Sequence, residues 1–117
     1  MKTFKQALVV LALGLSAFFL MGATPTVTGE AAHELVKQGA LLLDVRTPQE
    51  FQGGHLDGAV NVPVQELEAK LATLPAKMDQ PIVVYCRSGH RSANAAELLK
   101  KAGYTKVQDL GAMSNWK

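Results

Sequence analysis

Short apolar runs alternate with amphipathic segments along most of the chain. Runs of four or five mostly apolar residues are typical of strands that are covered on both faces. We expect such strands at residues 41–45, 59–62, 81–85 and 106–110. Helical spacing or helix-capping residues predict helices at residues 28–38, 48–52, 64–74 and 93–101. This alternation predicts an α/β fold, with a small, mainly parallel, twisted sheet and helices on both faces.

The N-terminal residues 1–23 form a separate segment. Lys2 and Lys5 give it a basic start, and no charged residue occurs in the 17 positions from 7 to 23. This is the plan of a secretory signal peptide, so we expect cleavage near Ala23 and export to the periplasm. The uncharged run also reaches the lower edge of a bilayer-spanning length. The alternative is therefore an uncleaved anchor in the inner membrane, with the domain facing the periplasm.

One domain is expected downstream of this segment. Residues 24–27, with Pro25, have the character of a short linker, and residues 28–117 then form the domain. The chain has 12 basic and 10 acidic side chains, and two of the basic ones, Lys2 and Lys5, lie in the N-terminal segment. The domain itself is thus balanced in charge, which argues against a nucleic-acid partner. We expect a monomer that contacts a membrane only if the N-terminal segment is retained.

Cys86 is the only cysteine, so it cannot form an internal disulfide. It lies where an apolar strand turns into a helix, and such a turn presents backbone N–H groups that bind anions and favour thiolate over thiol. Gly89 allows the positive φ angle that a tight loop needs. Cys86 is therefore a candidate nucleophile for a small oxyanion substrate. The other candidate residues of this loop carry cations, hydroxyls or an imidazole: Arg87, Ser88, His90, Arg91 and Ser92.

The histidines do not predict a metal site. His33, His55 and His90 lack metal-ligand spacing, and one cysteine cannot build a cysteine cluster. We expect no metal and no other cofactor. We expect His55 to bond to backbone within a loop, His90 to face solvent, and Trp116 to pack at the edge of the core.

Four segments, in order, resemble the rhodanese domain family in its single-domain, exported form. The first two are LLDVRTPQEF at 42–51 and GHLDGAVNVP at 54–63. The third, VVYCRSGHRS at 83–92, is similar to the family's catalytic loop, and residues 103–116 resemble its closing segment. One difference is Gly111-Ala112, where the family often has a pair of glycines. Together the four segments span nearly all of the expected domain.

The resemblance implies a sulfurtransferase with thiosulfate as the sulfur donor. The Cys86 thiolate would attack the outer sulfur of thiosulfate, release sulfite and retain a persulfide. A thiophilic acceptor, cyanide or a thiol, would then remove that sulfur. Backbone N–H groups of residues 87–91 would stabilise the persulfide, and Arg87 or Arg91 would attract thiosulfate.

Asp44 and Arg46 follow the first expected strand and are candidate supporting residues, together with Ser92. In a parallel sheet the carboxyl ends of the strands lie at one edge, so these residues share a rim with Cys86. They either orient this rim or form an ion pair with each other or with Glu50, and we favour the ion pair.

Two alternatives to a turnover enzyme remain open. A non-catalytic persulfide carrier or sensor would keep every residue named above. A phosphatase or arsenate reductase would use a Cys-x5-Arg loop, whereas Cys86 and Arg91 are separated by four residues. The shorter loop suits one persulfide sulfur better than a tetrahedral phosphate, which favours the sulfurtransferase.

Overall fold

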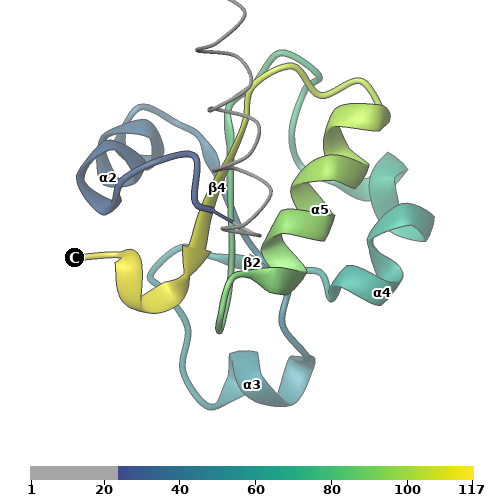
Figure 1. The fold of residues 1–117 in the computed structure, drawn as a ribbon. Helices are drawn as coiled ribbons and strands as arrows, with labels where there is room; N and C mark the ends of the chain where they lie inside the picture. The colour runs from purple at the N-terminus through teal and green to yellow at the C-terminus, as the bar shows by residue number, and fades with distance from the viewer. Residues whose placement is uncertain (1–23) are drawn as a thin grey trace, which may run out of the picture.

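The computed structural model describes residues 24–117, and Figure 1 shows them as a central sheet between helices. The expected signal peptide, residues 1–23, lies outside the described residues. The sheet has four strands in the order β2-β1-β3-β4, and every neighbouring pair is parallel. The strands are β1 (Leu41–Asp44), β2 (Val60–Asn61), β3 (Ile82–Cys86) and β4 (Val107–Ala112). The predicted α/β fold with a parallel sheet is confirmed.

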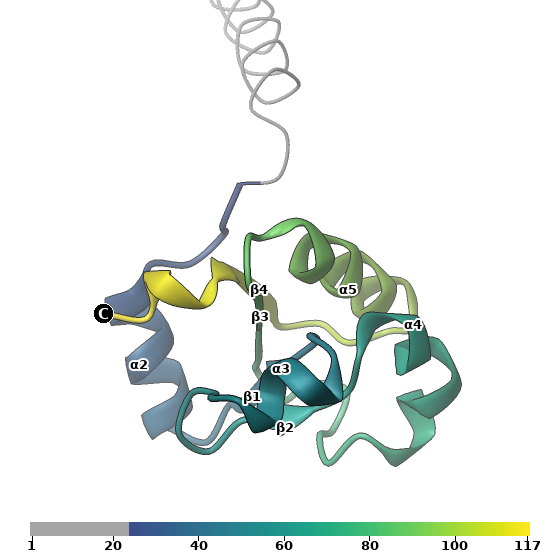
Figure 2. The same cartoon turned by 90° about the horizontal axis from the view of Figure 1, so that it is seen from below.

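Helices cover both faces of this sheet, as the alternating pattern predicted (Figure 2). One face is covered by α4 (Val64–Leu67), the 3-10 helix η1 (Glu68–Thr73) and α5 (His90–Lys101). The other face is covered by α2 (Gly29–Lys37) and the 3-10 helix η2 (Met113–Asn115). The short helix α3 (Pro48–Gln52) lies beyond the carboxyl ends of the strands (Figure 1).

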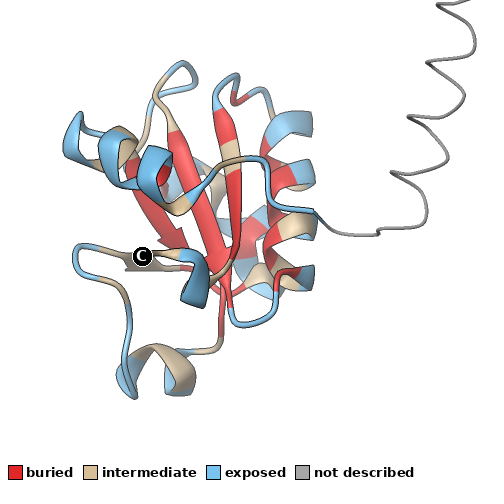
Figure 3. Cartoon of the chain, turned by 60° about the vertical axis from the view of Figure 1, so that its left-hand side comes forward, coloured by how far each residue is buried: buried red, intermediate tan, exposed pale blue. Residues whose placement is uncertain are grey.

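The two faces carry separate apolar cores, because consecutive residues of a strand point to opposite sides. Leu43 and Val84 pack with Leu99 on the α5 side. Leu42 and Tyr85 pack on the α2 side, where Trp116 also joins the core as expected. β1 and β3 are buried along their whole length, which accounts for their nearly unbroken apolar sequence (Figure 3).

Several boundaries differ from the predicted ones. α5 begins at His90 rather than at Ala93, because Gly89 has φ 107° and acts as its N-cap. The helix predicted over 64–74 is α-helical only to Leu67 and continues as η1. No residue of η1 is buried, so core packing does not favour regular α-helical geometry there.

The expected linker is bound to the sheet. Thr26 N–H donates to the Asp109 carbonyl at 2.8 Å, and Asp109 N–H donates to the Thr26 hydroxyl at 2.8 Å. Thr26 therefore pairs with the free edge of β4, which leaves fewer exposed backbone groups there. In the part of the chain from residue 24 onward, no helix has the length and apolar character needed to cross a bilayer.

Candidate active site around Cys86

Cys86 is the last residue of β3 and is completely buried. Its sulfur accepts the Gly89 N–H at 3.0 Å and the Ser92 N–H at 3.4 Å. Both donors lie where the chain turns from β3 into α5. The sulfur thus lies at the positive end of a twelve-residue helix. Converging N–H donors at a helix N-terminus form the kind of arrangement that binds anions.

Gly89 is the residue that shapes this turn. A side chain at φ 107° would be strained, so glycine is needed at this position. The Ser92 hydroxyl donates to the Gly89 carbonyl at 3.0 Å and ties the turn to the helix. Ser92 is fully buried, whereas Arg87, Ser88 and His90 are exposed on the outer side of the loop.

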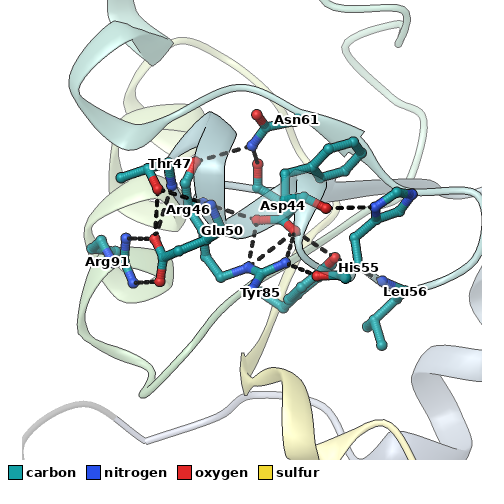
Figure 4. Close-up of polar contacts among 11 residues, drawn as sticks. Asp44, Arg46, Thr47, Glu50, His55, Leu56, Asn61, Tyr85 and Arg91 are labelled. Atoms are coloured by element: carbon teal, nitrogen blue, oxygen red, sulfur yellow. Dashed lines mark hydrogen bonds and ion pairs between the residues drawn. The ribbon is translucent and has the colours of Figure 1, made fainter.

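The two loop arginines differ in their surroundings. Arg91 forms a two-pronged ion pair with Glu50 of α3, at 2.7 and 3.1 Å (Figure 4). Its charge is thus matched by a carboxylate. Arg87 makes no hydrogen bond or ion pair with any residue in the range 24–117 and lies exposed at the rim. Arg87 is therefore the loop cation available to an incoming anion.

Glu50 links the active-site helix to α3. The Arg91 guanidinium, and then the Thr47 N–H, lower the pKa of Glu50 from 4.5 to about 2. The same carboxylate closes the Thr47 capping box predicted from the sequence. Glu50 therefore holds α3 in place through both its own helix cap and α5.

This ion pair should make stability depend on pH. Because the folded-state pKa of Glu50 is lowered, its stabilisation is present above pH 4.5 and is lost as the pH falls toward about 2. We expect Glu50→Gln to lower the free energy of unfolding at pH 7 by roughly 1 kcal/mol, since the pair is partly solvent-screened. The difference from wild type should shrink below pH 4.5 in urea unfolding. Glu66→Gln, in the exposed Glu66–Lys70 pair, is the control. An equal loss in the free energy of unfolding in Glu66→Gln would contradict the prediction.

Asp44 and Arg46 form a buried ion pair at 2.7 Å, which is the pairing the sequence favoured (Figure 4). Tyr85, the residue before Cys86, donates its hydroxyl to Asp44 Oδ2 at 2.6 Å and accepts the Leu56 N–H at 3.1 Å. Burial, and then the Asp44 hydrogen bond, raises the pKa of the Tyr85 phenol, so it remains a donor. Arg46 also donates to the Gly54 carbonyl at 2.7 Å. The network ties the segment after β1 to the strand that ends in Cys86.

Tyr85 and Glu50 are the residues whose roles the sequence did not predict. The sequence alone places Tyr85 in a buried apolar strand and makes Glu50 a helix-capping residue and one possible partner for Asp44 or Arg46. A tyrosine in a buried strand could have indicated the network, because its buried hydroxyl needs a polar partner. The pairing of Glu50 with Arg91 spans 41 positions and has no local signal.

The rim beside the loop is a shallow hollow of about 500 Å³. Glu50 of α3, Arg87 of the loop and Met113 of η2 are among its lining residues. Its walls thus combine the Arg87 cation with the apolar Met113 side chain.

His55, as expected, bonds to backbone: Nδ1 lies 2.8 Å from the Phe51 carbonyl (Figure 4). Within residues 24–117 no group of three or more acidic, histidine or cysteine side chains could hold a metal ion.

A parallel α/β domain with one cysteine under converging N–H groups, at a strand-to-helix turn, is a rhodanese-type domain. The family model "Rhodanese-like domain" matches residues 28–117, and the chain belongs to this family. Its relatives include curated sulfurtransferases. Thiosulfate sulfurtransferase PspE of Escherichia coli is 36% identical over 62% of this chain and 70% of its own length. Human thiosulfate:glutathione sulfurtransferase is 34% identical over 82% and 96%.

Solved structures agree with this assignment. The human single-domain sulfurtransferase TSTD1 has a TM-score of 0.71 and 33% identity, covering 80% of this chain and 95% of that one. A rhodanese with anions from E. coli has a TM-score of 0.62 and 34% identity, covering 66% and 91%. These similarities establish the fold and the family.

Proposed function

We propose that the protein is a sulfurtransferase that moves the outer sulfur of thiosulfate through a persulfide on Cys86 to a thiophilic acceptor. The observation that carries the proposal is the pair of N–H groups, from Gly89 and Ser92, that point at the Cys86 sulfur. Relatives named thiosulfate sulfurtransferase support the same choice of donor. Cyanide or a thiol is the proposed acceptor.

The first step forms one S–S bond and breaks another. The Cys86 thiolate attacks the outer sulfur of thiosulfate, and the bonding electron pair leaves with sulfite. In the persulfide anion that remains, the negative charge lies mainly on the outer sulfur. This atom is bonded to the Cys86 sulfur, which accepts from the Gly89 and Ser92 N–H groups. The acceptor then attacks the outer sulfur and regenerates the Cys86 thiolate. Each step needs only the two substrates, so no cofactor is invoked.

Intact mass spectrometry tests the proposal directly. Incubation with thiosulfate should add the mass of one sulfur atom to the protein and release one sulfite per Cys86. Addition of cyanide should then remove that mass and produce thiocyanate. A protein that gains no sulfur from thiosulfate would contradict the proposed donor. Repeated turnover would separate an enzyme from a persulfide carrier, which discharges only to its own partner.

Arg87 is proposed to attract thiosulfate, because it is the exposed loop cation without a carboxylate partner among the described residues. We expect Arg87→Ala to raise KM for thiosulfate by roughly three- to tenfold with little change in kcat. Arg87→Lys, which keeps the charge, is the matched control and should stay within about twofold of wild type. High salt should reduce the difference between the two variants in steady-state assays. An unchanged KM in Arg87→Ala would contradict this role.

The phosphatase alternative is less favoured by the site. Such a reaction uses the arginine that closes a Cys-x5-Arg loop. Here Arg91 follows Cys86 after only four residues, and its guanidinium is paired with Glu50.

Export to the periplasm is also part of the proposal, supported by Lys2, Lys5 and the uncharged run that follows. Sequencing the N-terminus of the purified protein would distinguish a cleaved signal peptide from a retained anchor.

A further inference from the structure

A buried carboxyl lies under the reactive loop and has no part in the steps above. Asp109 is 4% exposed, in β4, and is paired in register with Val84 of β3. Because Val84 packs on the α5 side, the Asp109 side chain points to the same side. Burial raises the pKa of Asp109, and hydrogen bonding from Ser92 and the Gly111 N–H partly offsets this effect. Lys100 is the charged residue of α5 that also acts on it.

Ser92 ties the loop together around the sulfur. Its hydroxyl donates to the Gly89 carbonyl at 3.0 Å, and its backbone N–H donates to the sulfur at 3.4 Å. The Gly89 N–H makes the shorter of the two hydrogen bonds to Cys86, at 3.0 Å. The position of Gly89 therefore sets the closest donor to the sulfur.

The backbone of β4 is adapted to this contact. The register of β3 and β4 shifts between Val84 and Tyr85, so that Tyr85 pairs with Gly111. Asp109 Oδ1 accepts the Gly111 N–H at 2.8 Å and so holds this irregularity in place. A side chain at Gly89 would lie 3.8 Å from the Gly111 Cα, so the two glycines bring β4 close to the loop. A cavity of about 200 Å³, lined by both glycines and Asp109, lies between them.

We propose that Asp109 is a positioning residue for Cys86, because it holds Gly111, the residue beside Gly89, and thereby fixes the Gly89 N–H that donates to the sulfur. This inference rests on the proposed function, in which that N–H group stabilises the thiolate and the persulfide. Removal of the carboxyl takes away the acceptor of the Gly111 N–H. The loop donors then lose their fixed direction.

The test compares Asp109→Ala with Asp109→Asn and with Val107→Ala. Asparagine can accept from the Gly111 N–H as the carboxylate does, so it should restore this hydrogen bond. Val107→Ala removes a buried side chain from the same face of the same strand and controls for a general loss of packing. The readouts are the rate of Cys86 alkylation by iodoacetamide and the rate of persulfide formation from thiosulfate.

We expect Asp109→Ala to slow both rates about tenfold, while Asp109→Asn stays within about threefold of wild type and Val107→Ala is unchanged. Should Asp109→Ala not fold, Asp109→Leu takes its place, because leucine keeps a side chain of similar shape without the acceptor and should show the same loss. Equal rates in wild type and Asp109→Ala, no rescue by asparagine, or an equal loss in Val107→Ala would each overturn the inference. A wild type that forms no persulfide would refute the proposed function, while alkylation would still test Asp109.

Discussion

Cys86→Ser is expected to lower sulfur transfer from thiosulfate by more than about a thousandfold. A serine hydroxyl is not ionised at neutral pH and cannot form a persulfide, so neither half of the reaction can proceed. The sulfur is completely buried and is held by two N–H groups, which a serine oxygen can also accept. We therefore expect the variant to fold, with a free energy of unfolding within about 1 kcal/mol of wild type.

The measurement pairs steady-state thiocyanate production with intact mass after thiosulfate treatment. Wild type alkylated at Cys86 is the matched control, because Cys86 is the only cysteine and alkylation blocks the same sulfur in the native sequence. Both proteins should show no added sulfur and the background rate of thiocyanate formation. Activity retained in folded Cys86→Ser would remove the basis of the proposed mechanism.

The position of Cys86 could be predicted because its signals are local. The apolar strand, the single cysteine, Gly89 and the helix follow one another within residues 82–101, and the structure orders them in the same way. The β1 rim was predictable for a related reason, since the carboxyl ends of parallel strands lie at one edge. Local sequence therefore determines which residues surround the sulfur.

The partners of those residues could not be predicted from local sequence. The sequence leaves open whether Arg87 or Arg91 attracts thiosulfate, and the structure pairs the Arg91 guanidinium with Glu50 of α3. Tyr85 reaches Asp44 across neighbouring strands. Each of these contacts depends on register and side-chain packing between elements distant in sequence. A single sequence carries little information about such contacts.

The buried ion pair yields the largest stability effect that we expect. Asp44→Ala removes the carboxylate that accepts from Arg46 and from the Tyr85 hydroxyl, while the Arg46 side chain stays about 6% exposed. An uncompensated buried cation costs about 3–5 kcal/mol, a large part of the stability of a small domain. Asp44→Asn keeps an acceptor without the charge and should cost less. Urea unfolding at pH 7 measures both variants.

Glu66→Ala, in an exposed ion pair with Lys70, is the control and should change the free energy of unfolding by less than about 1 kcal/mol. A double variant, Asp44→Ala with Arg46→Met, should recover part of the loss, because it removes the unpaired charge as well. If Asp44→Ala were as stable as Glu66→Ala, the network would contribute no net stability. Its role would then be limited to holding the segment after β1 against the strand that ends in Cys86. Only a lower sulfur-transfer rate in Asp44→Ala would then reveal that role.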